Sequence, residues 1–275
     1  MMHPARTPPP YPSGHALLAG KRVLITAAAG TGIGFATAKR CLEEGAMVFV
    51  SDIHERRLRE SVEKLAFQAA AAPPLGGHSP TARSPPSRPC DVTRESDVRA
   101  LVADAVATLG GIDILVNNAG LGGSAAVIDM TDEQWSRVLD VSLTSVFRMT
   151  RAVLPHMYAQ KSGAIVNNAS VLGWRAQPLQ AHYAAAKAGV MAFTRCVALE
   201  AAEYGVRVNA VAPSIAMHEF LNKVTSTEVL AELERREAFG RTAQTWEIAN
   251  VIVFLASDLA SYMTGEIVSV SSQRA

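Results

Sequence analysis

The sequence predicts an α/β fold with a doubly wound parallel sheet of about seven strands in the order 3-2-1-4-5-6-7 and helices on both faces. Two observations carry this prediction. Short apolar runs alternate with longer helical patterns from about residue 21 to residue 270. The first apolar run opens into a glycine-rich turn, a helix and a second run that ends in an acid. There is no internal repeat and no linker between two cores, so residues 18–275 are expected to form one domain.

The composition argues against several classes of protein. The 275 residues carry a net charge of +1, which gives no electrostatic reason to expect a nucleic acid or an anionic membrane as partner. No apolar run approaches the ~18 residues of a membrane span. Cys41, Cys90 and Cys196 lack metal-like spacing and fit a reducing cytoplasm. Residues 1–17 are rich in proline and are expected to form a disordered tail.

The first predicted unit is typical of a dinucleotide site. A β-rich run at residues 21–26 leads into the glycine turn 27–34, a helix at 35–44, and a strand at 47–51 that ends in Asp52. The glycines let the backbone approach a pyrophosphate, and the helix N-terminus supplies N–H groups. The fold class is therefore Rossmann-type. The candidate cofactor contacts in this unit are Thr26, Gly30, Gly32, Ile33, Gly34 and Asp52.

Asp52 also indicates which cofactor binds. A carboxylate at this position accepts from a ribose 2′-hydroxyl and repels a 2′-phosphate. No basic residue stands beside it at 51 or 53, and Arg56 and Arg57 are expected on the solvent face of the next helix. The sequence therefore favours NAD over NADP.

The third strand is the weakest element of the predicted sheet. After a charged helical stretch at 54–68, residues 69–90 hold six prolines and no apolar alternation. The fold needs a strand ending near Cys90–Asp91, at or near the sheet edge, where proline is tolerated best. We expect a mobile loop at 70–89 and a short or missing strand.

The second half continues the alternation. Asn117–Gly120 follows a predicted strand at 112–116, and its small residues would let a nucleotide lie close, although read alone it is an ordinary polar turn. A long helix is expected at 132–160, with Pro155 as a candidate kink or end. Residues 216–240 are polar and helical, and we expect a substrate lid, with a solvated surface helix as the alternative. Further helices are expected at 95–109 and 245–257, and the helix that carries Tyr183 and Lys187 is expected to end near 203. Further strands are expected at 206–211 and 266–270, together with one that ends at residue 170.

Tyr183 and Lys187 are the candidate proton-handling pair. The i, i+4 spacing places the phenol and the ammonium on one face of a small-residue helix. A free tyrosine has a pKa near ~10, so it is a weak base at neutral pH. A nearby lysine charge favours the phenolate, and the Ser170 hydroxyl at the preceding strand end can donate to the same oxygen. Such a set can move a proton on or off an alcohol or carbonyl, although Tyr-xxx-Lys by itself is usually a surface pair.

The order of these motifs resembles the short-chain dehydrogenase/reductase family over about residues 18–272. The resemblance implies that Tyr183 exchanges the substrate proton, that Lys187 lowers its pKa and holds the nicotinamide ribose, and that Ser170 positions the substrate oxygen. It also implies a homotetramer that pairs the helices near 132–160 and at Tyr183. The further cofactor contacts that it implies are Asp91, Val92, Asn118, Ala119, Gly120, Tyr183, Lys187, Pro213 and Ile215.

Four departures from the family pattern stand out. The glycine turn is one residue longer and lacks its first glycine. Ser142 aligns with a fourth catalytic asparagine, so a water relay would depend on its hydroxyl or on a backbone carbonyl. Pro213–Ser214 replaces Pro-Gly, and His218 replaces a threonine that contacts the carboxamide. Ser-Val-Ser-Ser replaces the C-terminal Asp-Gly-Gly.

Several segments also resemble an actinobacterial steroid-catabolism subgroup. They are TAAAGTGIG, NNASVLGWRAQ and the Pro-Ser-Ile-Ala segment. The resemblance implies a hydroxylated, methylated hydroindanone propanoyl-CoA that is oxidised to the ketone. Arg175 and Lys223 are candidates for contacts with CoA phosphates. The residues expected to form an apolar pocket beside Ser170 are Trp174, Pro178, Leu179, Met217, Phe220 and Leu221.

The sequence is therefore compatible with three functions. The first is an NAD-dependent dehydrogenase of a bulky secondary alcohol. The second is a 3-oxoacyl-thioester reductase, which would usually favour NADPH and which Asp52 disfavours. The third is a catalytically impaired nucleotide-binding protein on the same fold, which Ser142 and Pro213–Ser214 favour and the Ser170, Tyr183 and Lys187 set disfavours.

Overall fold

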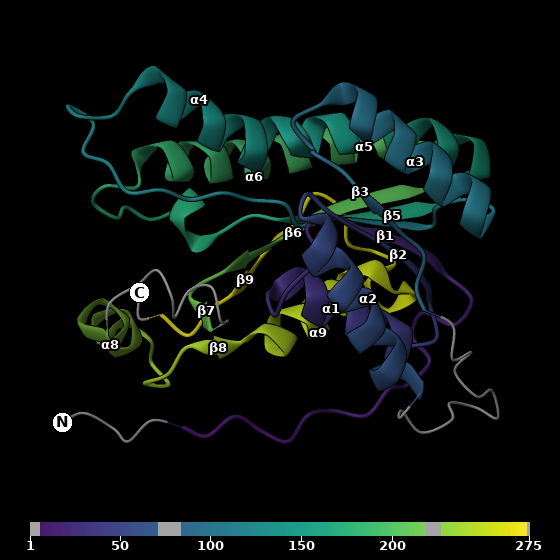
Figure 1. The fold of residues 1–275 in the computed structure, drawn as a ribbon, viewed down its shortest axis with the longest axis horizontal. Coiled ribbons are helices and arrows are strands. Elements are labelled where there is room, and N and C mark those ends of the chain that lie inside the picture. Colours follow the sequence, from purple (N-terminus) through teal and green to yellow (C-terminus); the bar gives the residue numbers. More distant parts are fainter. Residues whose placement is uncertain (1–5, 71–83, 218–226, 274–275) are drawn as a thin grey trace.

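The computed structural model describes residues 6–70, 84–217 and 227–273. A parallel sheet of seven strands has the order β3-β2-β1-β4-β5-β6-β9, which confirms the predicted order with β9 as the seventh strand (Figure 1). The strands are β1 (Arg22–Ile25), β2 (Met47–Asp52), β3 (Ser87–Pro89), β4 (Ile114–Asn117), β5 (Gly163–Asn168), β6 (Val206–Pro213) and β9 (Ile267–Val270). A separate short pair joins β7 (Ala216–Met217) to β8 (Ala243–Gln244).

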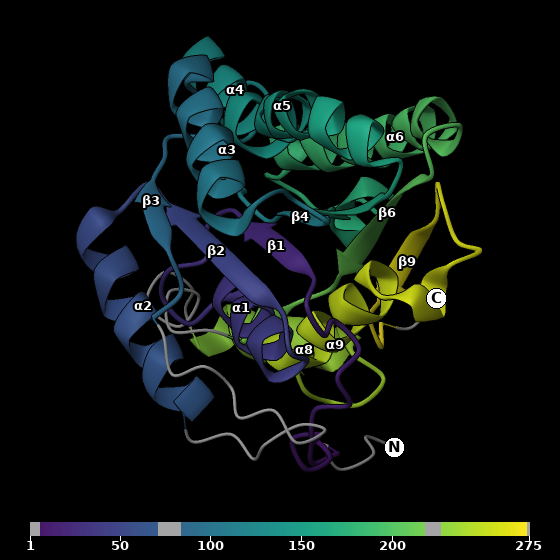
Figure 2. The ribbon, with the colours of Figure 1, turned by 90° about the vertical axis from the view of Figure 1, so that its right-hand side faces the viewer.

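Helices cover both faces of the sheet in two layers (Figure 2). One layer contains α1 (Ile33–Glu43), α2 (Glu55–Ala70) and α9 (Thr245–Ala256). The other contains α3 (Glu95–Leu109), α4 (Asp132–Leu139), α5 (Ser145–Gln160) and α6 (Ala181–Ala202). The remaining elements are α8 (Thr227–Arg236), the π-helical segment η1 (Asp140–Thr144), and the 3₁₀ turns η2 (Val171–Gly173) and η3 (Asp258–Ala260).

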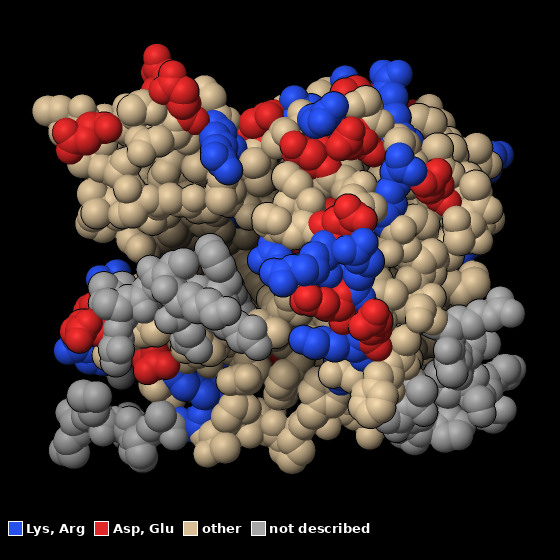
Figure 3. Space-filling model, in the orientation of Figure 1, with Lys and Arg blue, Asp and Glu red and all other residues tan. Residues whose placement is uncertain are grey.

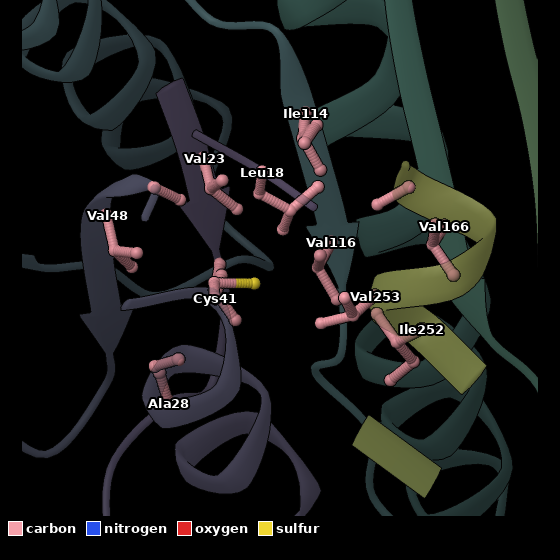
Figure 4. Packing of buried hydrophobic residues seen from close by; sticks show 14 of the residues in the cluster. Leu18, Val23, Ala28, Cys41, Val48, Ile114, Val116, Val166, Ile252 and Val253 are labelled. Carbon is pink, nitrogen blue, oxygen red and sulfur yellow. The ribbon is translucent and has the colours of Figure 1, made fainter. Parts of the chain in front are cut away.

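The hydrophobic core has two main parts, one on each face of the sheet, because the strands are buried on both faces. Val23 and Val116 pack against Cys41 of α1 and Ile252 of α9, as Figure 4 shows. The adjacent positions, including Leu24, point to the opposite face and pack against α3, α5 and α6. This two-sided burial explains why the strands are continuous apolar runs rather than alternating ones.

The third strand forms, although it is only three residues long. Ser87–Pro89 pairs with Val50–Asp52 of β2 at the edge of the sheet. Part of the segment expected to be a mobile loop is therefore a strand, because an edge position leaves the missing N–H of a proline without consequence. The rest of that expectation, residues 71–83, lies outside the described residues.

The predicted long helix at 132–160 is interrupted, but not at Pro155. Pro155 lies inside α5, which continues to Gln160. The break is the π-helical segment Asp140–Thr144 between α4 and α5. A π segment inserts an extra residue into a turn and is frequent at functional sites. It brings Ser142 into the interior, with none of its surface exposed.

The N-terminal segment differs from the expected disordered tail over residues 6–17. The Tyr11 hydroxyl donates to Glu43 of α1, and its ring meets the Trp246 ring of α9 edge-on at 5.5 Å. The buried Glu44 carboxylate accepts from the backbone N–H groups of His15 and Leu17. Proline-rich composition predicts an extended chain, but an extended chain with an aromatic anchor can still dock on a folded surface.

The segment expected to be a lid is only partly described. Residues 227–236 form the charged helix α8, whereas 218–226 lie outside the described residues and include His218, Phe220, Leu221 and Lys223. After α8 the chain forms β8, which pairs with β7, the short strand that follows β6. The helix therefore stands at the carboxyl end of β6, where a cover over the site would have to lie.

Candidate active site

The carboxyl ends of β1, β4, β5 and β6 meet at one edge of the sheet, and a cavity of about 460 Å³ lies there. Figure 3 shows this face hollowed, with acidic and basic side chains interspersed beside the hollow. In a parallel doubly wound sheet this edge is where ligands bind. The cavity is lined by residues of the glycine turn, the polar turn after β4, the strands β5 and β6, the helices α6 and α8, and the C-terminal segment. Among them are Ile33, Asn118, Gly120, Ser170, Tyr183, Lys187, Pro213 and Ile215, all of which the sequence singled out.

Ser170, Tyr183 and Lys187 converge on this cavity. Ser170 caps the 3₁₀ turn after β5, and its Oγ accepts from the Leu172 N–H at 3.2 Å. Tyr183 and Lys187 lie in the first two turns of α6, with the ammonium 5.5 Å from the phenol ring centroid. The Lys187 Nζ donates to the backbone oxygen of Asn168 at 2.6 Å. The structure thus brings together the three residues that the sequence placed in one site.

Burial governs the ionisation of this pair. Desolvation raises the pKa of Tyr183, and hydrogen bonding with the Ser170 hydroxyl lowers it by less. Desolvation lowers the pKa of Lys187 to about 8. The expectation that Lys187 lowers the tyrosine pKa is thus not met in the protein alone, because desolvation is the larger effect. The protonated phenol is the favoured form at neutral pH.

A chain of hydrogen bonds ties the lysine to the glycine turn. The Asn168 side-chain amide donates to the Asn118 Oδ1 at 2.9 Å, and the Asn118 amide donates to the backbone oxygens of Thr26 and Ala27. The Thr26 hydroxyl accepts from the Asn118 N–H. Asn118 and Thr26 therefore hold the site together. Asn168 was missed by the sequence reasoning, although two successive asparagines at the end of a buried strand were a signal for it.

The glycine turn fits a dinucleotide. A Cβ on Gly34 would lie 2.3 Å from the Ala27 backbone oxygen, so only glycine allows this packing of α1 on the turn. A Cβ at Gly30 or Gly32 would meet no atom within 4 Å, which leaves the turn open to an approaching ligand. Gly32 is the N-cap of α1 and provides no side chain to cap the helix. The open turn and the helix N-terminus form a phosphate-sized cradle.

Asp52 ends β2 and is 7% exposed. Its carboxylate accepts from the backbone N–H groups of Ala29 and His54 at 3.2 and 3.0 Å. Arg57 is exposed to solvent on α2, as expected, and its guanidinium also lies 3.8 Å from the carboxylate. Each carboxylate oxygen has a second lone pair, so Asp52 can still accept from a ligand hydroxyl.

The adenine side of the predicted cofactor site is a second hollow, of about 670 Å³, next to Asp91. Ile53, Thr93 and residues of α4 and η1 line it. The Asp91 carboxylate accepts from the N–H and the hydroxyl of Thr93, which fixes the turn after β3. Val92 and Ala119 pack in the core beneath it. Asp91 lines this hollow, and its role and that of Val92 toward an adenine ring stay predictions.

Ser142 lies behind the Gly120 turn rather than in the lining of the cavity, and its hydroxyl bonds to one residue. Its hydroxyl donates to the Leu121 backbone oxygen and accepts from the Leu121 N–H, both at 2.9 Å. Its one proton is therefore not available to a water. A Cβ at Gly122 would touch the Tyr183 ring at 4.0 Å, so the turn that Ser142 holds lies over the phenol.

The predicted apolar pocket beside Ser170 is wrong for the residues that the structure describes. None of Trp174, Pro178, Leu179 and Met217 lines the cavity, and the Trp174 side chain is 50% exposed. The apolar lining comes from Val171, Leu172, Ile215 and Leu233. Arg175 donates to the Gln273 side chain, and its contact with a CoA phosphate stays a prediction. Pattern reading located the loop but not the direction of its side chains.

Three further observations concern the rest of the described molecule. A cavity of about 520 Å³ at the opposite end of the sheet, near Lys21 and Arg207, contains none of the predicted site residues. Within the described ranges, no cluster of three metal-ligating side chains occurs. None of the helices described here has the length and apolar character needed to cross a membrane.

A Rossmann-type sheet with an open glycine turn and a converging Ser-Tyr-Lys set defines the class of nicotinamide-dependent oxidoreductases acting on alcohols and carbonyls. Residues 27–272 match the family model described as enoyl-(acyl carrier protein) reductase. The chain belongs to the short-chain dehydrogenase/reductase family.

The individual relatives narrow this further. The chain is 59% identical, over 95% of each sequence, to the (5R,7aS)-5-hydroxy-7a-methyl-1-oxo-2,3,5,6,7,7a-hexahydro-1H-indene-carboxyl-CoA reductase of Mycobacterium tuberculosis. It is 39% identical to the 3-oxoacyl-[acyl-carrier-protein] reductase of Thermotoga maritima, with 92% of this chain and 97% of that one covered. A crystal structure of a short chain dehydrogenase from Mycobacterium smegmatis matches with a TM-score of 0.82 and 55% identity over 97% and 98% of the two chains.

Proposed function

We propose that this protein is an NAD-dependent oxidoreductase that interconverts a ring hydroxyl and a ketone on a bicyclic, steroid-derived acyl-CoA. The convergence of Ser170, Tyr183 and Lys187 on one cavity carries the proposal. The 59% identity to a relative that acts on a hydroxylated, methylated indene-carboxyl-CoA supports the substrate class.

The residues divide the chemistry between them. When bound, the nicotinamide ring supplies the hydride acceptor or donor. Tyr183 donates its phenolic proton to the carbonyl oxygen in reduction and accepts the hydroxyl proton, as phenolate, in oxidation. Ser170 holds the same oxygen, and Lys187 stabilises the phenolate and binds the nicotinamide ribose hydroxyls. Because burial favours the protonated phenol, reduction has its proton donor ready at neutral pH and oxidation should accelerate as the pH rises.

The preference for NAD rests on Asp52. Its carboxylate can accept from a ribose 2′-hydroxyl and would repel a 2′-phosphate. The Arg57 guanidinium, 3.8 Å from the carboxylate, works in the opposite direction because it offsets part of the negative charge.

Tyr183→Phe tests the mechanism. We expect turnover to fall by about 10²–10⁴-fold, because the variant removes the proton-transfer group, while the NAD dissociation constant changes little. Turnover is followed by NADH absorbance and binding by calorimetry. Tyr262→Phe is the matched control for preparation effects, since Tyr262 is fully exposed and does not line the cavity. Wild-type rates in Tyr183→Phe would contradict the mechanism.

A 3-oxoacyl-thioester reductase is the second candidate, and the 39% identity to the Thermotoga maritima enzyme favours it. The two functions differ in cofactor and in substrate shape. Activity on a linear 3-oxoacyl thioester with NADPH, and none on a ring alcohol with NAD, would replace the first proposal by the second.

We further infer a cytoplasmic homotetramer. Partly exposed aromatic side chains on the outer surfaces of α4 and α5, Trp135 and Phe147, and the exposed Leu199 of α6 support an association through these helices. The three cysteines are unpaired thiols, which suits a reducing compartment. The molar mass of the purified protein, measured by light scattering, tests the tetramer. The mass of a monomer would contradict it.

A further inference from the structure

The catalytic cavity includes two side chains from parts of the chain far from its chemistry. Leu233 comes from α8, and Gln273 comes from the segment after β9. Figure 1 shows this yellow C-terminal segment running toward α8. Neither side chain belongs to the set of Ser170, Tyr183 and Lys187. Leu233 and Gln273 can therefore contact a part of the ligand other than the reacting group.

The C-terminal segment is fastened at the end of α8. Glu237 and Gln273 form an isolated antiparallel bridge. The Glu237 side chain, 2% exposed, accepts from both the N–H and the hydroxyl of Ser272. The Gln273 N–H donates to the Ser271 hydroxyl at 3.0 Å. Gln273 therefore has a fixed backbone at the rim of the site.

The side-chain amide of Gln273 is also oriented. Its Oε1 accepts from the Arg175 guanidinium, which belongs to the loop after Ser170. A guanidinium has donors only, so it selects the oxygen end of the amide and leaves the NH₂ group for another partner. An NH₂ group can donate only, and a ligand that meets it must present an acceptor oxygen.

We propose that Gln273 donates to a second carbonyl oxygen of the substrate, remote from the reacting hydroxyl, and that Arg175 is a positioning residue that turns the amide toward it. The proposal deepens the proposed function and rests on it. Its ligand class is a hydroxylated ring compound that carries a further carbonyl. That carbonyl is either a ring ketone or a thioester, and both occur in the compound named for the Mycobacterium tuberculosis relative. A site with a dedicated donor discriminates against analogues that lack the acceptor.

Two substrate pairs test the proposal and distinguish the two carbonyl sources. The first pair is a hydroxyhydrindanone and the same hydroxyhydrindane without the ketone. The second is the CoA thioester of a hydroxycyclohexane carboxylic acid and the matching CoA thioether, in which a methylene group replaces the carbonyl. For each pair the preference is the kcat/KM of the carbonyl compound divided by that of its analogue. We expect the wild-type enzyme to show a preference in at least one pair, and Gln273→Leu to lower that preference about tenfold.

Gln273→Glu separates donation from a merely structural tie. The carboxylate still accepts from Arg175, and more strongly, but it offers no donor to the substrate. The proposal expects the preference to fall in Gln273→Glu as far as in Gln273→Leu. A preference retained in Gln273→Glu and lost in Gln273→Leu would overturn it, because the residue would then act only by holding the loop to the C-terminal segment.

Arg175→Leu tests the positioning role. Freed from its partner, the amide can turn either end to the cavity, so the preference should fall by less than in Gln273→Leu. The double variant should lose no more than Gln273→Leu alone. Gln180→Leu is the matched control. Its amide donates to the Gly123 backbone oxygen and does not line the cavity, so the preference should stay at the wild-type value.

The remaining outcomes are also decisive. Gln177 lines the cavity too, and a preference lost in Gln177→Leu but kept in both Gln273 variants would overturn the assignment to Gln273. If the wild-type enzyme oxidises both members of each pair with equal kcat/KM, the second-carbonyl contact is absent while the proposed function stands. If it oxidises no ring alcohol, the proposed function itself fails.

Discussion

Lys187 lies in the interior of the protein, and only 2% of its surface is exposed. Within the described ranges its ammonium donates to one protein acceptor, the Asn168 backbone oxygen. Burial lowers the pKa from an ordinary 10.5 to about 8, so the charged form is disfavoured in the folded state by roughly 3 kcal/mol. A residue that destabilises the fold in this way is expected where catalysis needs its charge.

The pH dependence of stability checks this cost. Below pH 8 the lysine is protonated in both states and the penalty is complete, whereas between pH 8 and 10.5 only the unfolded chain binds the proton. The contribution of Lys187 to the free energy of unfolding therefore becomes less unfavourable as the pH rises. Lys187→Met should be more stable than the wild type at pH 7, by up to roughly 3 kcal/mol, with a smaller difference at pH 10.

Chemical denaturation of both proteins at pH 7, 8.5 and 10 measures this difference. Other titrating groups, including Tyr183, are common to the two proteins and largely cancel. A difference that does not vary with pH would show that Lys187 is not buried as a charge.

Asp52 sets the expected cofactor preference at the residue scale. Asp52→Asn keeps one acceptor oxygen and removes the charge that repels a 2′-phosphate, so the ratio of kcat/KM for NAD over NADP should fall at least about tenfold. Arg57→Gln should change the same ratio in the opposite direction, because it removes the cation 3.8 Å from the carboxylate. Steady-state kinetics with both cofactors provide the measurement. An unchanged ratio in both variants would place the selectivity elsewhere.

The π-helical segment between α4 and α5 shows what one element contributes to the site. It directs Ser142 inward, where the hydroxyl holds both backbone groups of Leu121. The turn that follows lies over Tyr183. Ser142 is therefore better explained as a positioning residue than as a member of a proton relay.

Variants at Ser142 separate the two roles. Ser142→Ala leaves the Leu121 N–H and oxygen without their partner and should lower the free energy of unfolding by about 1–3 kcal/mol. It should also reduce kcat/KM without shifting the pH at which activity rises. Ser142→Asn restores the residue type common in the family, but the site has no exposed surface, so overpacking should prevent any gain. A shifted pH profile in Ser142→Ala would instead indicate that the hydroxyl passes protons.

At the scale of the whole molecule, residues 6–17 link parts of the fold that the sheet does not connect. Tyr11 bonds Glu43 of α1, stacks edge-on with Trp246 of α9, and has the Lys39 ammonium 3.8 Å from its ring centroid. Closer to the N-terminus, the Arg6 N–H donates to the backbone oxygen of Phe239, a residue just after α8. The N-terminal segment thus runs from the cofactor helix to the base of the expected lid.

Substitutions of Tyr11 test this link. Tyr11→Ala removes the ring from between α1 and α9 and should lower the free energy of unfolding by about 1–3 kcal/mol, whereas Tyr11→Phe, which keeps the ring, should lose about 1 kcal/mol. Tyr262 is fully exposed, and Tyr262→Ala should leave stability unchanged. Thermal and denaturant unfolding compare the four proteins. Equal stability of Tyr11→Ala and the wild type would mean that the segment does not stabilise the fold.

Features that depend on one segment of the chain could be predicted from the sequence, whereas features that depend on contacts between segments could not. The bounds of α3, the strand order and the shared face of Tyr183 and Lys187 followed from the sequence, because each depends on a repeat or spacing within one segment. The position of the helix break did not follow, since Pro155 is the stronger local signal and tertiary packing overrides it. Asn168 was missed because its role depends on partners in two other segments.

The sequence alone was enough to predict the Rossmann-type sheet, the glycine turn that precedes Asp52, and the placing of Ser170, Tyr183 and Lys187 in one site. These features arise from hydrophobic periodicity and from motifs whose members lie close in the chain. Only the tertiary structure decided which side chains complete the cavity. Leu233 and Gln273 enter it from α8 and the C-terminal segment, and Arg175 turns to Gln273 rather than outward. Contacts between segments so far apart are chosen by packing of the finished fold, and no local pattern encodes them.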